Sequence, residues 1–157
     1  MRAICFLFVF FCFQQLKAQT IQVTGEVTKK LNLTKDDLAK MKRSTVTAKD
    51  KNGKDHIYKG VAVADILELA GVTTGAQLRG ENLSKYLLVT CADGYAVVFS
   101  LAELDAAFTD KVVLLADEGD GQPLPIDKGP WRIVVPGEKK PARSCYKVTT
   151  FKISFAK

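Results

Sequence analysis

Residues 127–147 read DKGPWRIVVPGEKKPARSCYK and join a turn, a short apolar strand and a basic loop. The Gly129-Pro130 pair indicates the turn, and the run 131–135 has the aromatic and β-branched residues of a strand. Arg132 stands inside that run. Because an unpaired buried guanidinium is costly, an arginine in such a strand either points to solvent or meets an anion.

Five basic side chains lie close together in this segment, between residues 128 and 143. One interpretation is a phosphate or carboxylate clamp built from arginine forks and lysine point charges. The other is a solvated hairpin tip, which is the interpretation that charge alone favours. The five residues are Lys128, Arg132, Lys139, Lys140 and Arg143.

The first eighteen residues have the pattern of a secretory signal peptide. Arg2 precedes the apolar run 4–13, and Ala18 is a small residue before a polar junction. The apolar run is too short for a membrane-spanning helix, which needs about 20 residues. We therefore expect cleavage after Ala18 rather than a membrane anchor. The mature chain, residues 19–157, is then one periplasmic or secreted domain without a transmembrane segment.

The 157-residue chain carries a formal net charge of +6 at pH 7, part of which comes from Arg2 and Lys17 in the expected leader. This mild positive charge suits solubility and the attraction of small anions, but it does not by itself indicate nucleic acid. We expect no nucleic-acid partner.

Two of the four cysteines, Cys91 and Cys145, lie outside the leader. A disulfide between them and a pair of free buried thiols both remain open, and the free thiols are slightly favoured. The only histidine is His56 and no CxxC motif occurs, so a Cys/His zinc site is close to excluded. We expect His56 on the surface without a visible partner.

Three short helices are predicted from their ends and their apolar spacing. Thr34 is a suitable N-cap for the first, and Gly71 closes the second. Ser100 and Glu103 form a capping box that starts the third, through Phe108. The three segments span 33–41, 63–72 and 100–108.

Hairpins dominate the rest of the chain. Asn-Gly at 52–53 and Asp-Gly at 93–94 are typical hairpin turns, and each is flanked by alternating or β-branched residues. The helices do not alternate regularly with the strands as in βαβ units. We therefore expect an α+β fold with mainly antiparallel or mixed sheets and about three short helices.

The order and spacing of four segments resemble the oxidoreductase molybdopterin-binding domain, the pterin-holding domain of sulfite-oxidase-type enzymes. The most specific piece is G-x-P-L-P at 121–125, followed by G-P-x-R-[IL]-V-V-P-G at 129–137. The resemblance extends from about residue 20 to 155, which is nearly all of the expected mature chain. The four segments are 58–72, 89–104, 113–139 and 142–153.

This resemblance implies a cofactor, molybdopterin, whose molybdenum is held by the pterin dithiolene and by one protein cysteine. By the same resemblance, Arg132 and a basic residue of the following loop, Arg143, would bind the anionic part of the cofactor. Lys128 lies where family members often carry a polar or histidine residue, and Tyr146 lies where lysine is usual. The expected cofactor-binding residues are Lys128, Arg132, Arg143 and Tyr146.

The sequence departs from the family pattern at the metal. The family's ligand cysteine precedes the segment that starts at Tyr58, yet residues 19–57 contain no cysteine. Cys91 lies in a later hairpin and does not correspond to it. A soft thiolate completes the metal's coordination in this family, so its absence brings oxygen-transfer chemistry into question. No catalytic or metal-ligating residue is assigned.

Two functions follow, and the sequence does not decide whether the chain is an enzyme. The first is an exported domain that binds the pterin or a similar small anion without full metal chemistry. The alternative is an active periplasmic molybdopterin-dependent oxidoreductase whose metal ligand is an oxygen of Ser44, Thr45 or Thr47. A weaker third possibility is a structural domain that binds only a protein partner.

Overall fold

The computed structural model describes residues 19–156. The signal peptide predicted at 1–18 lies outside the described residues. Within 19–156, no helix combines the length and the apolar character needed to cross a membrane.

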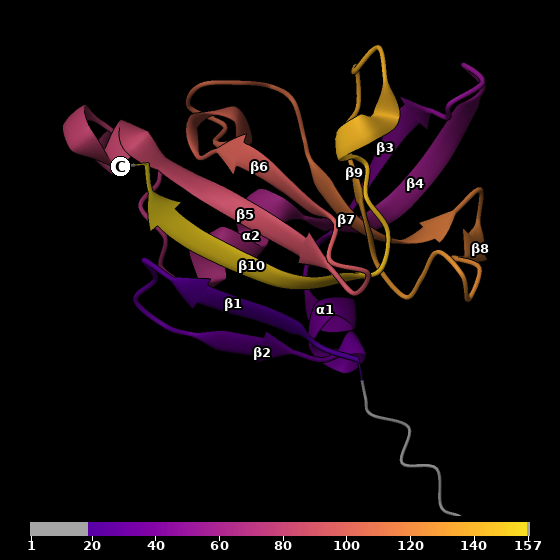
Figure 1. The fold of residues 1–157 in the computed structure, drawn as a ribbon, viewed down its shortest axis with the longest axis horizontal. Coiled ribbons are helices and arrows are strands. Elements are labelled where there is room, and N and C mark those ends of the chain that lie inside the picture. The colour runs from indigo at the N-terminus through magenta and orange to yellow at the C-terminus, as the bar shows by residue number, and fades with distance from the viewer. Residues whose placement is uncertain (1–18, 157) are drawn as a thin grey trace, which may run out of the picture.

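The first sheet brings the beginning and the end of the described chain together. Its strand order is β2-β1-β10-β5-β6, and β1 pairs with β10 in parallel while the other neighbours are antiparallel. In Figure 1, the indigo strand β1 and the yellow strand β10 lie side by side. The strands are β1 (Ile21–Gly25), β2 (Leu31–Leu33), β5 (Lys85–Cys91), β6 (Ala96–Ser100) and β10 (Val148–Phe155).

The second sheet is antiparallel and has the order β3-β4-β7-β8, with β9 also paired to β7. Strands β4 and β7 approach closely at Gly60, where an added Cβ would lie 2.1 Å from the Leu115 carbonyl oxygen. The register between the two strands shifts at this position. The strands are β3 (Arg43–Lys49), β4 (Asp55–Ala62), β7 (Leu114–Gly119), β8 (Gln122–Pro123) and β9 (Arg132–Val134).

Two of the three predicted helices are confirmed. Helix α1 (Lys35–Lys40) begins with a capping box between Thr34 and Asp37. Helix α2 (Val63–Leu69) is followed by Gly71 at φ +68°, a left-handed conformation that glycine adopts without strain. The segment between α2 and β5 contains the 3-10 turns Gly75–Gln77 and Gly80–Ser84.

The prediction of a third helix through Phe108 was wrong. The capping contacts are present: the Ser100 N–H donates to Glu103 Oε1 at 2.8 Å, and the Glu103 N–H donates to Ser100 Oγ at 3.3 Å. Only the 3-10 turn Ala102–Leu104 follows them. Asp105 ends it, because its carboxylate accepts hydrogen bonds from the Ala107 N–H and from a distant loop N–H, which competes with helix formation.

The main hydrophobic core lies between the two sheets and helix α2. It includes Val89 and Phe151 from the first sheet, Ile133 from the second and Ile66 from α2. Trp131 is also buried there. Together the two sheets and the short helices confirm the α+β class.

The outer face of the second sheet carries a separate, smaller apolar cluster. Its buried members are Ala48, Tyr58, Leu114, Ala116 and Val134. Side chains alternate along a strand, so Ile133 faces the main core while its two neighbours in β9 face this cluster. This alternation places Arg132 on the outer face.

Candidate functional site

Arg132 lies on the outer face of the second sheet with only 7% of its surface exposed. Its Nη1 donates to the Tyr58 hydroxyl at 2.9 Å, and its Nη2 donates to the Ser144 carbonyl at 3.4 Å. The buried Nε has no acceptor among residues 19–156. A guanidinium has five N–H donors, so most of its hydrogen-bonding capacity is unused.

Two tyrosine rings stack on this guanidinium. The Arg132 Cζ lies 4.7 Å from the centroid of the Tyr58 ring and 4.3 Å from that of the Tyr146 ring. Tyr58 comes from β4, and Tyr146 is held beside β9 by an antiparallel β-bridge to Arg132. The Lys128 ammonium lies 5.9 Å from the Tyr146 ring centroid. The structure therefore brings three of the four predicted cofactor-binding residues together.

The positive charge at this site is not compensated. Neither Arg132 nor Lys128 forms an ion pair within the described part of the chain. Tyr58 cannot neutralise Arg132, because burial raises the pKa of its hydroxyl more than the nearby guanidinium lowers it. A buried cation without an ion pair attracts an anion strongly, since little water screens it.

Arg143, the fourth predicted residue, has different partners. Its Nε donates to Glu138 Oε1 at 2.8 Å and its Nη1 donates to Glu103 Oε2 at 3.1 Å. The same Nη1 reaches the Val98 carbonyl of β6 at 3.2 Å, and the guanidinium lies 4.6 Å from the Phe99 ring centroid. Two carboxylates thus neutralise Arg143, and it shares none of these contacts with Arg132.

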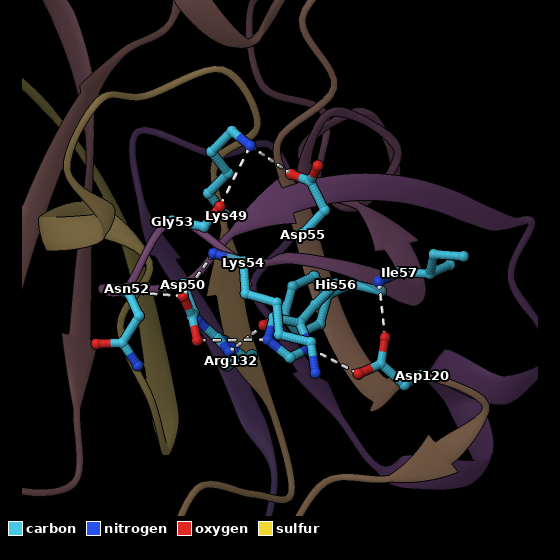
Figure 2. Close-up of polar contacts among 11 residues, drawn as sticks. Lys49, Asp50, Asn52, Gly53, Lys54, Asp55, His56, Ile57, Asp120 and Arg132 are labelled. Carbon is cyan, nitrogen blue, oxygen red and sulfur yellow. Dashed lines mark hydrogen bonds and ion pairs between the residues drawn. The ribbon is translucent and has the colours of Figure 1, made fainter.

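His56 has partners that sequence reasoning missed. Its Nδ1 lies 2.6 Å from Asp120 Oδ2, and its Nε2 lies 3.5 Å from Asp50 Oδ2 (Figure 2). The hydrogen bond with Asp120 is the largest cause that raises the pKa of His56, and Asp50 adds to it. His56 is partly exposed, but the expectation that it has no partner was wrong. His56 and Tyr58 lie on one face of β4, with ring centroids 6.2 Å apart, so this network borders the Arg132 site.

Comparison with known families agrees with the geometry. The sequence model of one protein family, the oxidoreductase molybdopterin binding domain, matches residues 13–147. The chain belongs to this family. No curated protein matches the sequence.

This molybdopterin-binding domain also resembles a solved structure, the sulfane dehydrogenase SoxCD from Paracoccus pantotrophus. The TM-score is 0.69 and the sequence identity is 22%, over 86% of this chain and 38% of the SoxCD chain. At this identity the likeness shows the fold, which is the sulfite-oxidase-type fold expected from the sequence. The domain spans less than half the length of that SoxCD chain.

The cysteines of the domain do not face the Arg132 site. Cys91 and Cys145 are free and buried, and both belong to the main core on the other side of the second sheet. Burial is the largest cause that raises the pKa of each thiol. Within residues 19–156, the donors near Arg132 therefore fit the anionic part of a pterin cofactor, but no thiolate lies there to bind its metal.

Strand β3 carries the three side chains that the alternative hypothesis considers as oxygen ligands of the metal. Thr45 and Thr47 are exposed, whereas Ser44 alternates with them and lies on the outer face. Ser44 pairs with Gly60 of β4. Gly60 pairs in turn with Ala116 of β7, and Ala116 pairs with Arg132 of β9. Ser44 is thus three strand spacings, about 14 Å, from Arg132 along the sheet.

Proposed function

We propose that this domain binds a pterin cofactor, or a similar small anion, at Arg132 and does not complete the coordination of a molybdenum ion. The observation that supports this most is the buried guanidinium of Arg132, which has no ion pair and an Nε without an acceptor. A buried charge without an opposite charge is unfavourable unless a ligand pairs with it. A phosphate or carboxylate would accept the unused N–H groups in a charge-assisted contact.

Each residue of the site has a separate part in binding. Arg132 supplies the fixed cation, and Tyr58 orients it through its hydroxyl and its ring. Lys128 adds a second, exposed charge that attracts the anion before it is bound. Arg143 was also expected to bind the anion. In this conformation its positive charge is already neutralised by Glu103 and Glu138.

The cofactor would bring the redox chemistry, which in this family is oxygen-atom transfer at molybdenum. The described residues would bind and orient the pterin and exclude water from its anionic group. Cys91 and Cys145 are protonated thiols in the core, which supports binding without a protein thiolate at the metal. For this reason we favour a binding domain over a complete oxidoreductase.

Cofactor content tests this proposal directly. The protein would be produced with molybdopterin biosynthesis available, and released pterin and molybdenum would be measured in the same sample. We expect bound pterin with far less than one molybdenum per chain, and loss of pterin in Arg132→Gln. Arg79→Gln, which changes an exposed arginine, is the matched control and should keep its pterin. Pterin that stays bound without Arg132, or absence of pterin from the folded wild type, would refute the proposal.

The oxidoreductase with an oxygen ligand is the second candidate function, because Ser44 lies on the same face as Arg132. It predicts one molybdenum per chain and its loss in Ser44→Ala, while Thr45→Ala and Thr47→Ala keep the metal. Substoichiometric molybdenum in the wild type would eliminate it.

We also propose that the domain is exported, which rests on the pattern of residues 1–18. The mass of the protein recovered outside the cytoplasm tests this. Cleavage after Ala18 gives a chain that begins at Gln19, whereas an intact N-terminus on cytoplasmic protein would contradict export.

A further inference from the structure

Tyr146 is the exposed member of the stack around Arg132. Arg132 is 7% exposed and its Nε is fully buried, whereas Tyr146 is 39% exposed. The Tyr146 ring nevertheless lies 4.3 Å from the guanidinium carbon. Of the two tyrosines whose rings contact the guanidinium, Tyr146 is thus the one at the solvent-facing side, since Tyr58 is only 7% exposed.

The backbone that carries Tyr146 is held firmly on both sides. The Ile133 N–H donates to the Cys145 carbonyl at 2.8 Å, and the Ala92 N–H donates to the Lys147 carbonyl at 2.9 Å. Together with the β-bridge between Tyr146 and Arg132, these bonds fix the loop against β9 and β5. Only rotation of the side chain is then available to move the ring.

The Tyr146 side chain itself has no polar anchor. Its hydroxyl makes no hydrogen bond within the described chain, while the Tyr58 hydroxyl accepts from Arg132 and the Tyr95 hydroxyl donates to the Ala142 carbonyl at 2.9 Å. Stacking on cations is the contact that holds the Tyr146 ring in place. Exposed side chains change rotamer on the picosecond to nanosecond timescale, so such a ring can open readily.

We infer that the Tyr146 ring is a displaceable cover over the Arg132 guanidinium, and that an anion binds there only after the ring has rotated away. This inference rests on the proposed function, because it concerns access to the same anion site. The ring and the anion compete for one cation. The apparent affinity for the anion is therefore lower than that of the open site, by the fraction of molecules in which the ring is open.

Removing the ring should strengthen anion binding. We expect Tyr146→Ala to bind inorganic phosphate about tenfold more tightly than the wild type in calorimetric titration at low ionic strength, from the usual strength of such stacking. Tyr146→Phe keeps the stacking ring and should behave like the wild type. Tyr86→Ala removes another partly exposed tyrosine, from β5, and is the matched control. The double variant Tyr146→Ala, Arg132→Gln should not bind phosphate.

A second measurement needs no ligand. Exchange of the Arg132 Nε proton with water, followed by NMR, should be slow in the wild type and faster in Tyr146→Ala. Equal exchange rates in the two proteins would overturn the inference. Thermal unfolding of every variant shows that a change in exchange does not come from loss of the fold.

The phosphate titration separates the two ways to fail. If wild type and Tyr146→Ala bind phosphate equally and both depend on Arg132, the cover is refuted while the anion site stands. If no folded variant binds phosphate through Arg132, the anion site is refuted and the cover with it.

Discussion

Arg132 and Arg143 belong to the same basic segment, yet their surroundings are opposite. Arg132 is buried between two tyrosine rings without a carboxylate. Arg143 is more exposed and is paired with Glu103 and Glu138. The difference shows that a basic residue is available to a ligand only when the protein has not already neutralised it. Arg143 acts as a clamp between the loop after β9 and strand β6, whereas Arg132 keeps its charge.

The largest effect is expected for a substitution of Arg132, which should weaken anion binding strongly and change the stability of the fold only slightly. Arg132→Gln should weaken pterin or anion binding by about 100-fold, since a buried charged contact is lost. The same change should alter the free energy of unfolding by only about 1 kcal/mol, because two ordinary hydrogen bonds are lost while an unpaired buried charge is removed.

Titration of the anion and urea unfolding of the same samples measure both quantities. A loss of several kcal/mol of stability in Arg132→Gln would mean that Arg132 is structural, and the contrast with Arg143 would disappear.

The reverse result is expected at Arg143. Arg143→Gln should leave anion binding unchanged and lower the free energy of unfolding by about 1 kcal/mol, because Glu103 and Glu138 lose their partner at a partly exposed site. High salt should reduce this difference, since it screens the ion pairs. Urea unfolding at low and high salt measures it, with Lys152→Gln as the control for loss of an exposed charge. A large loss of pterin binding would return Arg143 to the cofactor site.

The smallest effect is expected at His56, whose charge depends on pH. Its pKa is raised above 6.5 by Asp120 and Asp50, so the folded state binds the proton more tightly than the unfolded state. The stabilisation is complete below about pH 6.5 and is lost as the pH rises through the raised pKa. At the acidic end, the pKa values of Asp50 and Asp120 are lowered, so their contribution is lost as the pH falls below 3.8.

Melting temperatures of the wild type and His56→Gln across this range measure that dependence. The two curves should differ most near pH 6 and converge at alkaline pH. Identical melting curves for the two proteins would contradict the role of His56.

Local features of the fold were readable from the sequence, because they depend on residues a few positions apart. The N-cap Thr34, the closing Gly71 and the two hairpin turns are of this kind. The helix expected after Ser100 failed, although its capping box was real, because the Asp105 carboxylate is bound by a loop thirty residues earlier. That contact depends on tertiary structure.

The candidate site could be predicted only in part, because some of its features depend on a local motif and others on tertiary contacts. The family motif pointed to Arg132, and its position in an apolar strand indicated that it would either point to solvent or meet an anion. Its lack of an ion pair depends on which side chains meet across the sheet. Asp120 as a partner of His56 and Glu103 as a partner of Arg143 could not be found either, since they lie 64 and 40 residues away along the chain. Such pairs require the strand register, which no short pattern contains.

The parallel pairing of β1 with β10 has a consequence for how the protein is made. β10 is the last strand in the described chain, and it occupies the middle of its sheet between β1 and β5. Until residue 155 has left the ribosome, β1–β2 and β5–β6 are two separate hairpins without a common neighbour. Assembly must then wait for contacts between distant parts of the polypeptide, which form slowly.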